Sequence, residues 1–237
     1  MQLNFKNERI LAIVAHPDDA ELLCAGTLAR AKQLDQANIA ICVLCQGDKG
    51  QPDPPLQNLA EVRRGEMQAA ANLLEAQLFW LGVPDSELAD SRETRVALVQ
   101  VIRGFQPTLV LGHASNDYHP DHQAASKLAE SASWLSVSKG IETDAQPLDG
   151  PPALWWMDTV DMHGFDPGFF VDIEPYFELK QSMLACHKSQ LSPEEDGGIS
   201  PLQTLLTRQA QARGAQCGVG AAEAFRIHHA WKRPCAW

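Results

Sequence analysis

Two short clusters of histidine and aspartate hold the side chains most able to do chemistry in this chain. The first spans residues 16–19 (His-Pro-Asp-Asp), and the second spans residues 119–122 (His-Pro-Asp-His). Two histidines and one carboxylate form the ligand set of a catalytic zinc site, because three protein ligands leave one coordination position open for water. We therefore expect a divalent metal to be bound by His16, Asp19 and His122.

The side chains beside these ligands have the chemistry to assist a hydrolysis. A metal lowers the pKa of water, and that water still needs a proton acceptor next to it. Asp18 is adjacent to a predicted ligand and is free to act as this general base. His119 can donate an N–H to an oxyanion or protonate a leaving amine.

Both clusters also have simpler interpretations. Asp18 and Asp19 could cap a following helix, and Asp121 could cap the next one. A histidine at the end of a strand could be held by ordinary hydrogen bonds in a loop. We favour the metal site because the two clusters follow separate predicted strands and can therefore converge, as metal ligands must.

The elements that would position these residues are visible in the hydrophobic pattern. Short β-rich apolar runs alternate with longer segments of helical period, which predicts an α/β, Rossmann-like fold with a mostly parallel sheet and helices on both faces. Open sheets of this kind bind ligands beyond the carboxyl ends of their strands, where both clusters fall. The predicted strands are residues 10–15, 39–44, 78–81, 108–111, 153–159 and 168–173. The predicted helices are residues 20–34, 59–74, 93–105, 123–134, 175–186 and 202–212.

Charge and composition exclude several functional classes. The 237 residues include 30 Asp and Glu against 19 Lys and Arg, which is a formal net charge of −11. An acidic chain without a concentrated basic patch is not expected to bind nucleic acid. No apolar run approaches the roughly 18–20 residues of a membrane span, and the charged N-terminus lacks the order of a secretory signal. We therefore expect a cytoplasmic protein without a membrane span.

Domain organisation and cysteine usage agree with this expectation. We expect residues 1–237 to form a single domain, because no low-complexity linker divides the sequence. The only close pair among the six cysteines is Cys42 and Cys45. This pair lies in a predicted strand, whose side chains alternate between faces, so we expect two core cysteines on opposite sides rather than a redox or zinc motif. Free thiols fit a reducing cytoplasm.

The two clusters and their surroundings resemble a known family. Residues 15–21 (AHPDDAE), followed by residues 117–122 (DYHPDH), are similar to the motifs of the PIG-L/LmbE-like zinc-dependent N-acetylglucosaminyl deacetylases. The resemblance spans nearly the whole chain. Further matching segments are residues 62–66 (VRRGE), 81–85 (LGVPD), 186–190 (CHKSQ), 213–215 (RGA) and 222–226 (AEAFR).

The resemblance implies a metal-dependent hydrolase that removes an acetyl group from an N-acetylated amino sugar or its conjugate. It implies Zn²⁺, with Fe²⁺ or another divalent ion as alternatives, on His16, Asp19 and His122. It also implies a general base at Asp18 and oxyanion or acid assistance from His119. Family members form homo-oligomers, so the resemblance implies a trimer or hexamer.

Three more residues match positions to which the family gives a role. Asp121 resembles the partner that orients His119. Arg63 and Asp85 resemble residues that contact sugar hydroxyls. Simpler interpretations are that Arg63 pairs with Glu66 on its own helix and that Asp85 is an ordinary turn residue.

Departures from the family pattern leave the substrate open. Residues 22–26 (LLCAG) stand where many members have glycines, Ala221 where a tyrosine often precedes the late segment, and Asp117 where some members have a tyrosine that assists the oxyanion. One alternative function is a metal-dependent phosphoesterase that recruits Asp18, Asp117 or His113 around a second metal. Another is a noncatalytic carbohydrate-binding protein that retains a metal, although the spare carboxylate of Asp18 argues against it.

Overall fold

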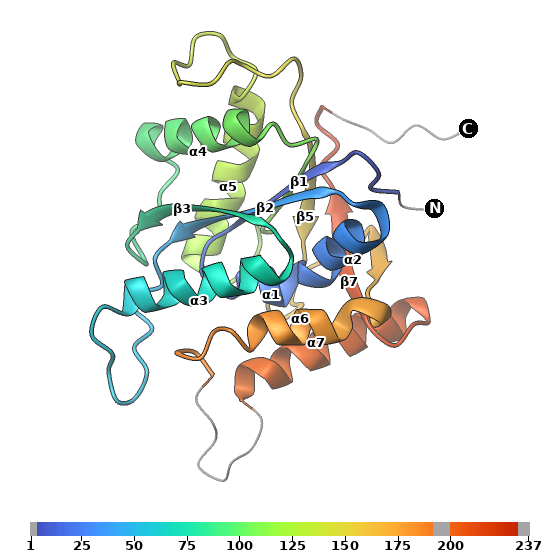
Figure 1. The fold of residues 1–237 in the computed structure, drawn as a ribbon. Helices are drawn as coiled ribbons and strands as arrows, with labels where there is room; N and C mark the ends of the chain where they lie inside the picture. Colours follow the sequence, from blue (N-terminus) through green and yellow to red (C-terminus); the bar gives the residue numbers. More distant parts are fainter. Residues whose placement is uncertain (1–3, 192–199, 232–237) are drawn as a thin grey trace.

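The computed structural model describes residues 4–191 and 200–231 (Figure 1). Within these residues a seven-stranded sheet has the order β3-β2-β1-β4-β5-β7-β6. Strands β3, β2, β1, β4 and β5 are parallel neighbours, and β7 runs antiparallel to both β5 and β6. The strands are β1 (Arg9–Val14), β2 (Asn38–Cys45), β3 (Gln77–Val83), β4 (Leu109–Gly112), β5 (Ala153–Met157), β6 (Phe169–Asp172) and β7 (Ala222–Ile227). The expected α/β fold with a mostly parallel sheet is confirmed.

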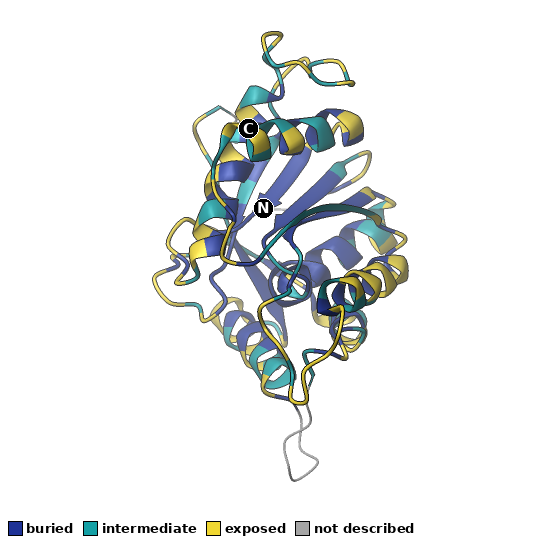
Figure 2. Cartoon of the chain, turned by 90° about the vertical axis from the view of Figure 1, so that its left-hand side faces the viewer, coloured by how far each residue is buried: buried dark blue, intermediate teal, exposed yellow. Residues whose placement is uncertain are grey.

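Helices cover both faces of this sheet, and Figure 2 shows the buried strands between helices whose outer surfaces are exposed. Helices α4 and α5 pack on one face, and α1, α2, α3, α6 and α7 pack on the other. No helix in residues 4–191 and 200–231 is long and apolar enough to cross a lipid bilayer. The helices are α1 (Asp19–Leu23), α2 (Ala25–Asp35), α3 (Leu59–Leu73), α4 (Arg92–Phe105), α5 (Pro120–Leu135), the 3₁₀ turn η1 (Glu174–Tyr176), α6 (Phe177–Leu184) and α7 (Pro201–Cys217).

Strand β1 shows why both faces are covered. Ile10 and Val14 pack in the cluster on the α1–α3 side, whereas Leu11 and Ile13 pack in the cluster on the α4–α5 side, and all four are fully buried. Side chains alternate along a strand, so a continuous apolar run requires burial on both faces. Strand β1 therefore occupies the interior of the sheet, between β2 and β4.

Several helix boundaries differ from the prediction, two of them beside the histidine and aspartate clusters. The predicted helix over residues 20–34 is divided into α1 and α2 at Cys24, where φ is −147°. The predicted helix over residues 123–134 begins earlier, at Pro120, whose fixed φ suits the first helical position. As a result, His122 lies in the first turn of α5 rather than in a loop.

The cysteine pair of β2 behaves as core residues with one correction. Cys42 and Cys45 are buried and free, as expected, and all five cysteines in the described part of the chain are free. The expectation that the two face opposite sides is wrong, because both pack in the cluster on the α4–α5 side. The register of β2 against β3 shifts between Val43 and Cys45, and such an irregularity interrupts the alternation of side chains.

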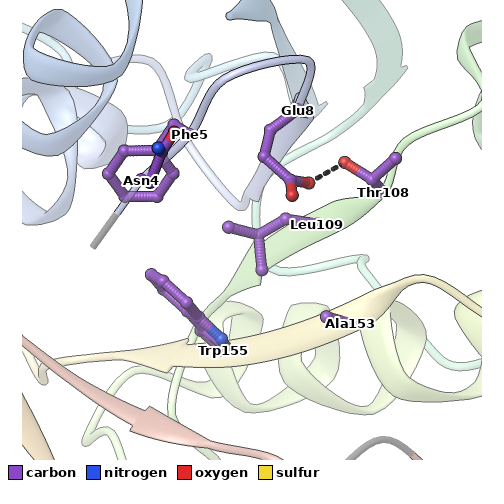
Figure 3. Close-up of a pocket in the computed structure, with 7 residues that line it drawn as sticks. All are labelled: Asn4, Phe5, Glu8, Thr108, Leu109, Ala153 and Trp155. Carbon is purple, nitrogen blue, oxygen red and sulfur yellow. Dashed lines mark hydrogen bonds between the residues drawn. The ribbon is translucent and has the colours of Figure 1, made fainter. Parts of the chain in front are cut away.

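The two edges of the sheet differ in character. At the amino edge of β1, β4 and β5 lies a cavity of about 390 Å³, where Glu8 and Thr108 are joined by a hydrogen bond (Figure 3). Its lining is formed by Asn4, Phe5, Glu8, Thr108, Leu109, Ala153 and Trp155. The histidine and aspartate clusters lie at the opposite, carboxyl edge. Because β1 and β4 are parallel neighbours, the polar segments that follow them meet there.

Candidate active site

The turn between β1 and α1 carries the first cluster. Strand β1 ends at Val14, Pro17 restricts the backbone of the turn, and α1 begins at Asp19. The backbone N–H of His16 donates to Asp19 Oδ2 at 2.7 Å. This hydrogen bond closes the turn and holds the imidazole and the carboxylate side by side.

The start of α5 carries the second cluster. His119 is the N-cap residue, and its Nδ1 accepts the backbone N–H of Asp121 at 3.1 Å. The backbone N–H of His119 in turn donates to Asp117 Oδ1 at 3.0 Å. These contacts fix the entry of the chain into the helix, so that His122 projects from the first turn toward the first cluster.

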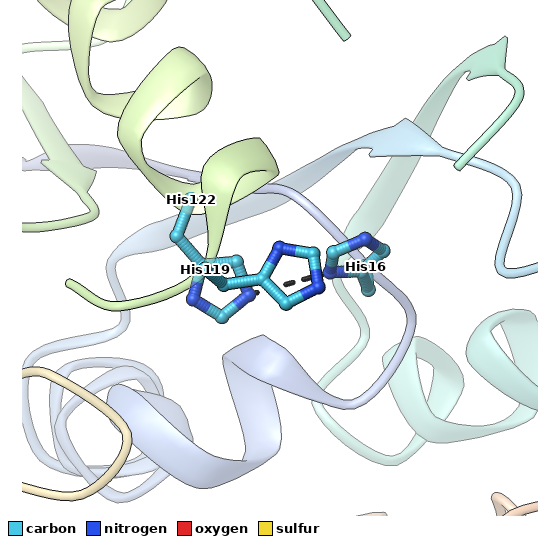
Figure 4. Close-up of side chains that lie close together, drawn as sticks. All are labelled: His16, His119 and His122. Atoms are coloured by element: carbon cyan, nitrogen blue, oxygen red, sulfur yellow. Dashed lines mark hydrogen bonds between the residues drawn. The ribbon is translucent and has the colours of Figure 1, made fainter. Parts of the chain in front are cut away.

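The donor atoms of the predicted ligands converge, and Figure 4 shows His16 and His122 close together beside His119. His16 Nδ1 lies 3.3 Å from His122 Nε2 and 3.6 Å from Asp19 Oδ2, and His122 Nε2 lies 3.3 Å from Asp19 Oδ1. A tetrahedral ion with bonds of about 2.0–2.2 Å separates its ligand atoms by roughly 3.3–3.6 Å. The two histidine nitrogens therefore have the spacing of neighbouring ligands of such an ion, and Asp19 lies beside each histidine through a different oxygen.

The charges around these residues favour a cation. Burial lowers the pKa of His16, but the hydrogen bond and charge of Asp19 outweigh burial and raise this pKa to about 12. Burial also lowers the pKa of His122, yet the charge of Asp19 and the contact with Asp117 raise it to about 9. Burial raises the pKa of Asp19, whereas the electrostatic and hydrogen-bond interactions with His122 and His113 hold it well below its usual value. The negative potential that retains protons on the buried His122 and the partly buried His16 also suits a divalent metal.

In each histidine of the trio, the ring nitrogen that points away from the other predicted ligands contacts a carboxylate. Asp117 Oδ1 lies 3.1 Å from His122 Nδ1, and Asp121 Oδ2 lies 3.1 Å from His16 Nε2. A carboxylate on one ring nitrogen sets the tautomer and the ring orientation, which leaves the other nitrogen to bind a metal. Asp117 and Asp121 thus direct the two inner nitrogens toward the same point.

This arrangement corrects the role expected for Asp121. The resemblance implied that its carboxylate orients His119, but the carboxylate contacts His16 and accepts the backbone N–H of Ser86 at 2.9 Å. Only the backbone of Asp121 reaches His119. The physical reason is that side chains two residues apart on a helix do not face each other.

His119 is placed to donate a hydrogen bond to a substrate. Because its Nδ1 accepts a backbone N–H, the proton of the neutral ring is on Nε2. Burial, followed by the nearby charge of His16, lowers the pKa of His119. The His119 ring lies 4.8 Å from the rings of His16 and His122, measured between centroids.

In the sequence, Asp18 stands between His16 and Asp19, the two predicted metal ligands of the first cluster. Its backbone is in the left-handed region, with φ at 106°, and its side chain accepts a hydrogen bond from Gln190 Nε2. Burial, followed by the charge of Asp19, raises the pKa of Asp18 to about 7. A carboxylate with such a pKa can both accept and return a proton near neutrality.

His113 also lies among these side chains. The sequence indicated it only as a ligand of a second metal. It follows β4 directly and is fully buried, and its ring stacks on His122 with centroids 4.2 Å apart. Its Nε2 accepts the backbone N–H of Ala15 at 3.0 Å and lies 3.3 Å from Asp19 Oδ2. Burial lowers the pKa of His113. The signal that could have found it is the same one that found the other clusters, a polar residue directly after a buried parallel strand.

The potential ligand atoms form overlapping sets rather than separate sites. The sets with atoms within 4.8 Å of one another are His16, His119 and His122; His16, Cys45 and Asp121; and Asp19, His113 and His122. Each set shares residues with the predicted trio. Cys45, buried at the end of β2, was not expected to contact the site and does so because the irregularity in β2 brings it beside His16.

Arg63 and Asp85 both hold the loop of residues 47–50. Arg63 donates to the backbone carbonyls at positions 47 and 50, both at 2.6 Å. Asp85 accepts the backbone N–H groups at positions 47 and 49, at 2.7 and 3.1 Å. Both side chains are buried, and Glu66 contacts Ser189 instead of Arg63. Their contact with sugar hydroxyls stays a prediction.

Comparison with known proteins adds a family match. The model of the PIG-L family, described as GlcNAc-PI de-N-acetylase, matches residues 11–133, which include both clusters. The 4-oxalmesaconate hydratase of Pseudomonas putida is 25% identical over 96% of this chain and 89% of its own length. The diacetylchitobiose deacetylase of Thermococcus kodakarensis is 29% identical over 79% of this chain and 72% of its own length.

A solved structure agrees with these matches. The N,N′-diacetylchitobiose deacetylase from Pyrococcus horikoshii, determined with its inhibitor MPG, superimposes with a TM-score of 0.81 and 27% identity. The superposition covers 93% of this chain and 84% of that chain. The similarity therefore extends well beyond the two clusters, to nearly the whole described fold.

Proposed function

The chain belongs to the PIG-L (GlcNAc-PI de-N-acetylase) family, and from this premise we propose that it is a metal-dependent N-deacetylase of an N-acetylated amino sugar or its conjugate. The observation that carries the proposal is the convergence of His16, Asp19 and His122, with 3.3–3.6 Å between contacting donor atoms. Asp18, which precedes Asp19 in the same turn, supplies a further carboxylate. A noncatalytic metal site has no need of that carboxylate. The deacetylase relatives support amide hydrolysis as the reaction.

The residues of the trio fit Zn²⁺, and we propose that they bind it. Two imidazole nitrogens and one carboxylate oxygen form a donor set that zinc accepts, and Fe²⁺ is the alternative that the same set can hold. When bound, such an ion acts as a Lewis acid that polarises a carbonyl and lowers the pKa of water.

Asp18 and His119 are proposed to carry out the proton transfer and the charge stabilisation. The carboxylate of Asp18 accepts a proton from water as the water oxygen bonds to the acetyl carbon. His119 donates its Nε2–H to the acetyl oxygen, where negative charge develops. Asp18 then returns the proton to the departing nitrogen as the C–N bond breaks. The products are acetate and a free amine.

The sugar end of the substrate is proposed to lie near the loop of residues 47–50. Arg63 and Asp85 hold this loop, and Gly47 lies close to Pro17 of the first cluster. Gly47 has φ at 71°, and a Cβ there would come within 2.7 Å of the Arg63 side chain. The close packing keeps the loop against the candidate active site.

Acetate release tests this proposal directly. The full chain, loaded with Zn²⁺, is incubated with N-acetylglucosamine, N,N′-diacetylchitobiose and N-acetylglucosaminides, and acetate is measured. We expect release that depends on the metal and that falls by about 10²–10⁴ in Asp18→Asn. The control is Asp166→Asn, which makes the same change at an exposed aspartate outside the site. No acetate from any of these substrates at full metal occupancy would contradict a deacetylase.

A two-metal phosphoesterase receives less support from the geometry. Each of the three residues that it would recruit already has a partner: His113 Nε2 accepts a backbone N–H, both oxygens of Asp117 accept backbone N–H groups, and Asp18 accepts a hydrogen bond from Gln190. One bound metal per chain would agree with the deacetylase, and two would favour phosphate chemistry.

A hydratase is the second candidate, because the hydratase relative matches most of both chains. Deprotonation of water by Asp18 would serve addition to a double bond as well as amide hydrolysis. The assay is consumption of 4-oxalmesaconate by the same metal-loaded protein. Turnover of this compound without acetate release from N-acetyl sugars would decide for the hydratase.

The wider organisation of the protein completes the proposal. We propose that residues 1–237 form one domain that works in the cytoplasm as a homo-oligomer, a trimer or hexamer. The free state of the described cysteines fits a reducing compartment. The oligomer rests on the family resemblance, and light scattering of the purified chain tests it.

A further inference from the structure

The turn of residues 187–190, which follows α6, is anchored to two helices through buried or partly buried carboxylates. His187 Nε2 lies 3.4 Å from Glu21 Oε2 of α1, and both residues are fully buried. Ser189 donates to the carboxylate of Glu66 in α3 through its backbone N–H at 2.8 Å and through its hydroxyl at 2.7 Å. These contacts fix the position of the turn relative to the first cluster.

The anchored turn presents Gln190 to Asp18. Gln190 Nε2 donates to Asp18 Oδ2 and, at 3.2 Å, to the backbone carbonyl oxygen of Pro17. A carboxylate and a carbonyl are both acceptors, so the amide can satisfy them only with its NH₂ group. The orientation of the Gln190 amide therefore follows from its partners and has no equivalent flipped form.

The backbone conformation of Asp18 gives it a need for such a partner. Its backbone has φ at 106° and ψ at −25°, a conformation that a residue with a Cβ rarely adopts. Residues in such conformations persist only when surrounding contacts hold them, and they concentrate at functional sites. The hydrogen bond from Gln190 to the Asp18 side chain is one such contact.

We propose that Gln190 is the positioning residue of Asp18. Its Nε2–H group holds Oδ2 and thereby leaves Oδ1 directed to the water that loses a proton. His187 and Ser189 act one step further away, by fixing the turn that carries Gln190. This assignment rests on the proposed function of Asp18 as the general base.

A kinetic double-mutant cycle on the metal-loaded full chain tests the assignment. Gln190→Met keeps the length of the side chain and removes the donor. In the presence of Asp18, kcat should fall by about tenfold, within the range of coupling between contacting residues, while KM and metal content stay unchanged. In an Asp18→Asn background no base remains to be positioned, so the same substitution should change kcat by less than about twofold. Equal losses in the two backgrounds would overturn the assignment.

Thermal unfolding tests the contact between Gln190 and Asp18 without reference to activity. The four proteins are the wild type, Gln190→Met, Asp18→Asn and the double variant. Gln190→Met should lower the Tm more when Asp18 is present than in the Asp18→Asn background, because a hydrogen bond to a carboxylate is about twice as strong as one to a neutral group. Equal Tm shifts would refute the contact. Gln181→Met makes the same change at an exposed position of α6 and should leave kcat and Tm unchanged. Coupling in Tm among the four proteins, together with no acetate release by the wild type, would refute the deacetylase proposal and support the contact.

Discussion

Replacement of Asp117 by asparagine should weaken metal binding by about 10- to 100-fold, the usual effect of losing a carboxylate behind a ligating histidine. Asp117 Oδ1 lies 3.1 Å from His122 Nδ1 and accepts the N–H of His119 at 3.0 Å, while Oδ2 accepts the N–H of Val160 at 3.1 Å. An amide has only one oxygen, so in either orientation its NH₂ group faces at least one of these N–H groups. The loss of such a charge-assisted hydrogen bond to a backbone N–H should also lower the stability of the fold by about 1.5–3 kcal/mol.

Competition with a chromophoric chelator measures this dissociation constant without reference to catalysis. His122→Ala provides the reference for loss of a ligand and should remove the metal. Asp166→Asn, at an exposed position, should bind as tightly as the wild type. Circular dichroism establishes that each variant is folded. A folded Asp117→Asn protein with wild-type metal affinity would refute the reasoning that Asp117 orients His122.

Three further substitutions separate the roles of other residues. Asp18→Asn should keep its metal by elemental analysis while kcat falls by about 10²–10⁴, as expected for a lost general base; loss of the metal would make Asp18 a ligand. Arg63→Ala should lower kcat/KM and Tm without lowering metal content, because Arg63 holds residues 47–50; unchanged kinetics on several N-acetyl sugars would restrict it to a structural role. Lys180→Met should lower the free energy of unfolding in urea by about 3–5 kcal/mol, because it leaves the carboxylate of Glu223 buried without its cation. A much smaller loss would mean that the backbone N–H groups bound to Glu223 suffice to satisfy it.

The fold class and the place of the site could be predicted from local sequence. The apolar runs at residues 10–15 and 39–44 are too continuous for a half-exposed strand, so they predict strands buried on both faces of a parallel sheet. Polar residues directly after such strands lie at one edge, because parallel strands share their direction. The prediction that His16, Asp19 and His122 bind a metal follows from this rule together with the ligand preferences of zinc.

Element boundaries depended on distant contacts. Nothing in the local pattern of residues 20–34 predicts the break between α1 and α2. In the structure, the carboxylate of Glu223 accepts the backbone N–H groups of Gly26 and Thr27, and Glu223 lies 197 residues from Gly26 along the chain. A buried carboxylate from β7 thus caps the start of α2, and no helical period records this contact.

The sequence by itself determined which kinds of side chain gather at the carboxyl edge of the sheet, and the tertiary structure alone decided which of them orient the others. Asp121 faces His16 rather than His119, Asp117 stands behind His122, and Gln190 reaches Asp18. These contacts join the ends of β1 and β4, the start of α5 and the turn after α6. Side-chain periodicity is set by neighbours in the chain, whereas these distances of a few ångströms depend on how the packed helices and strands are placed relative to one another.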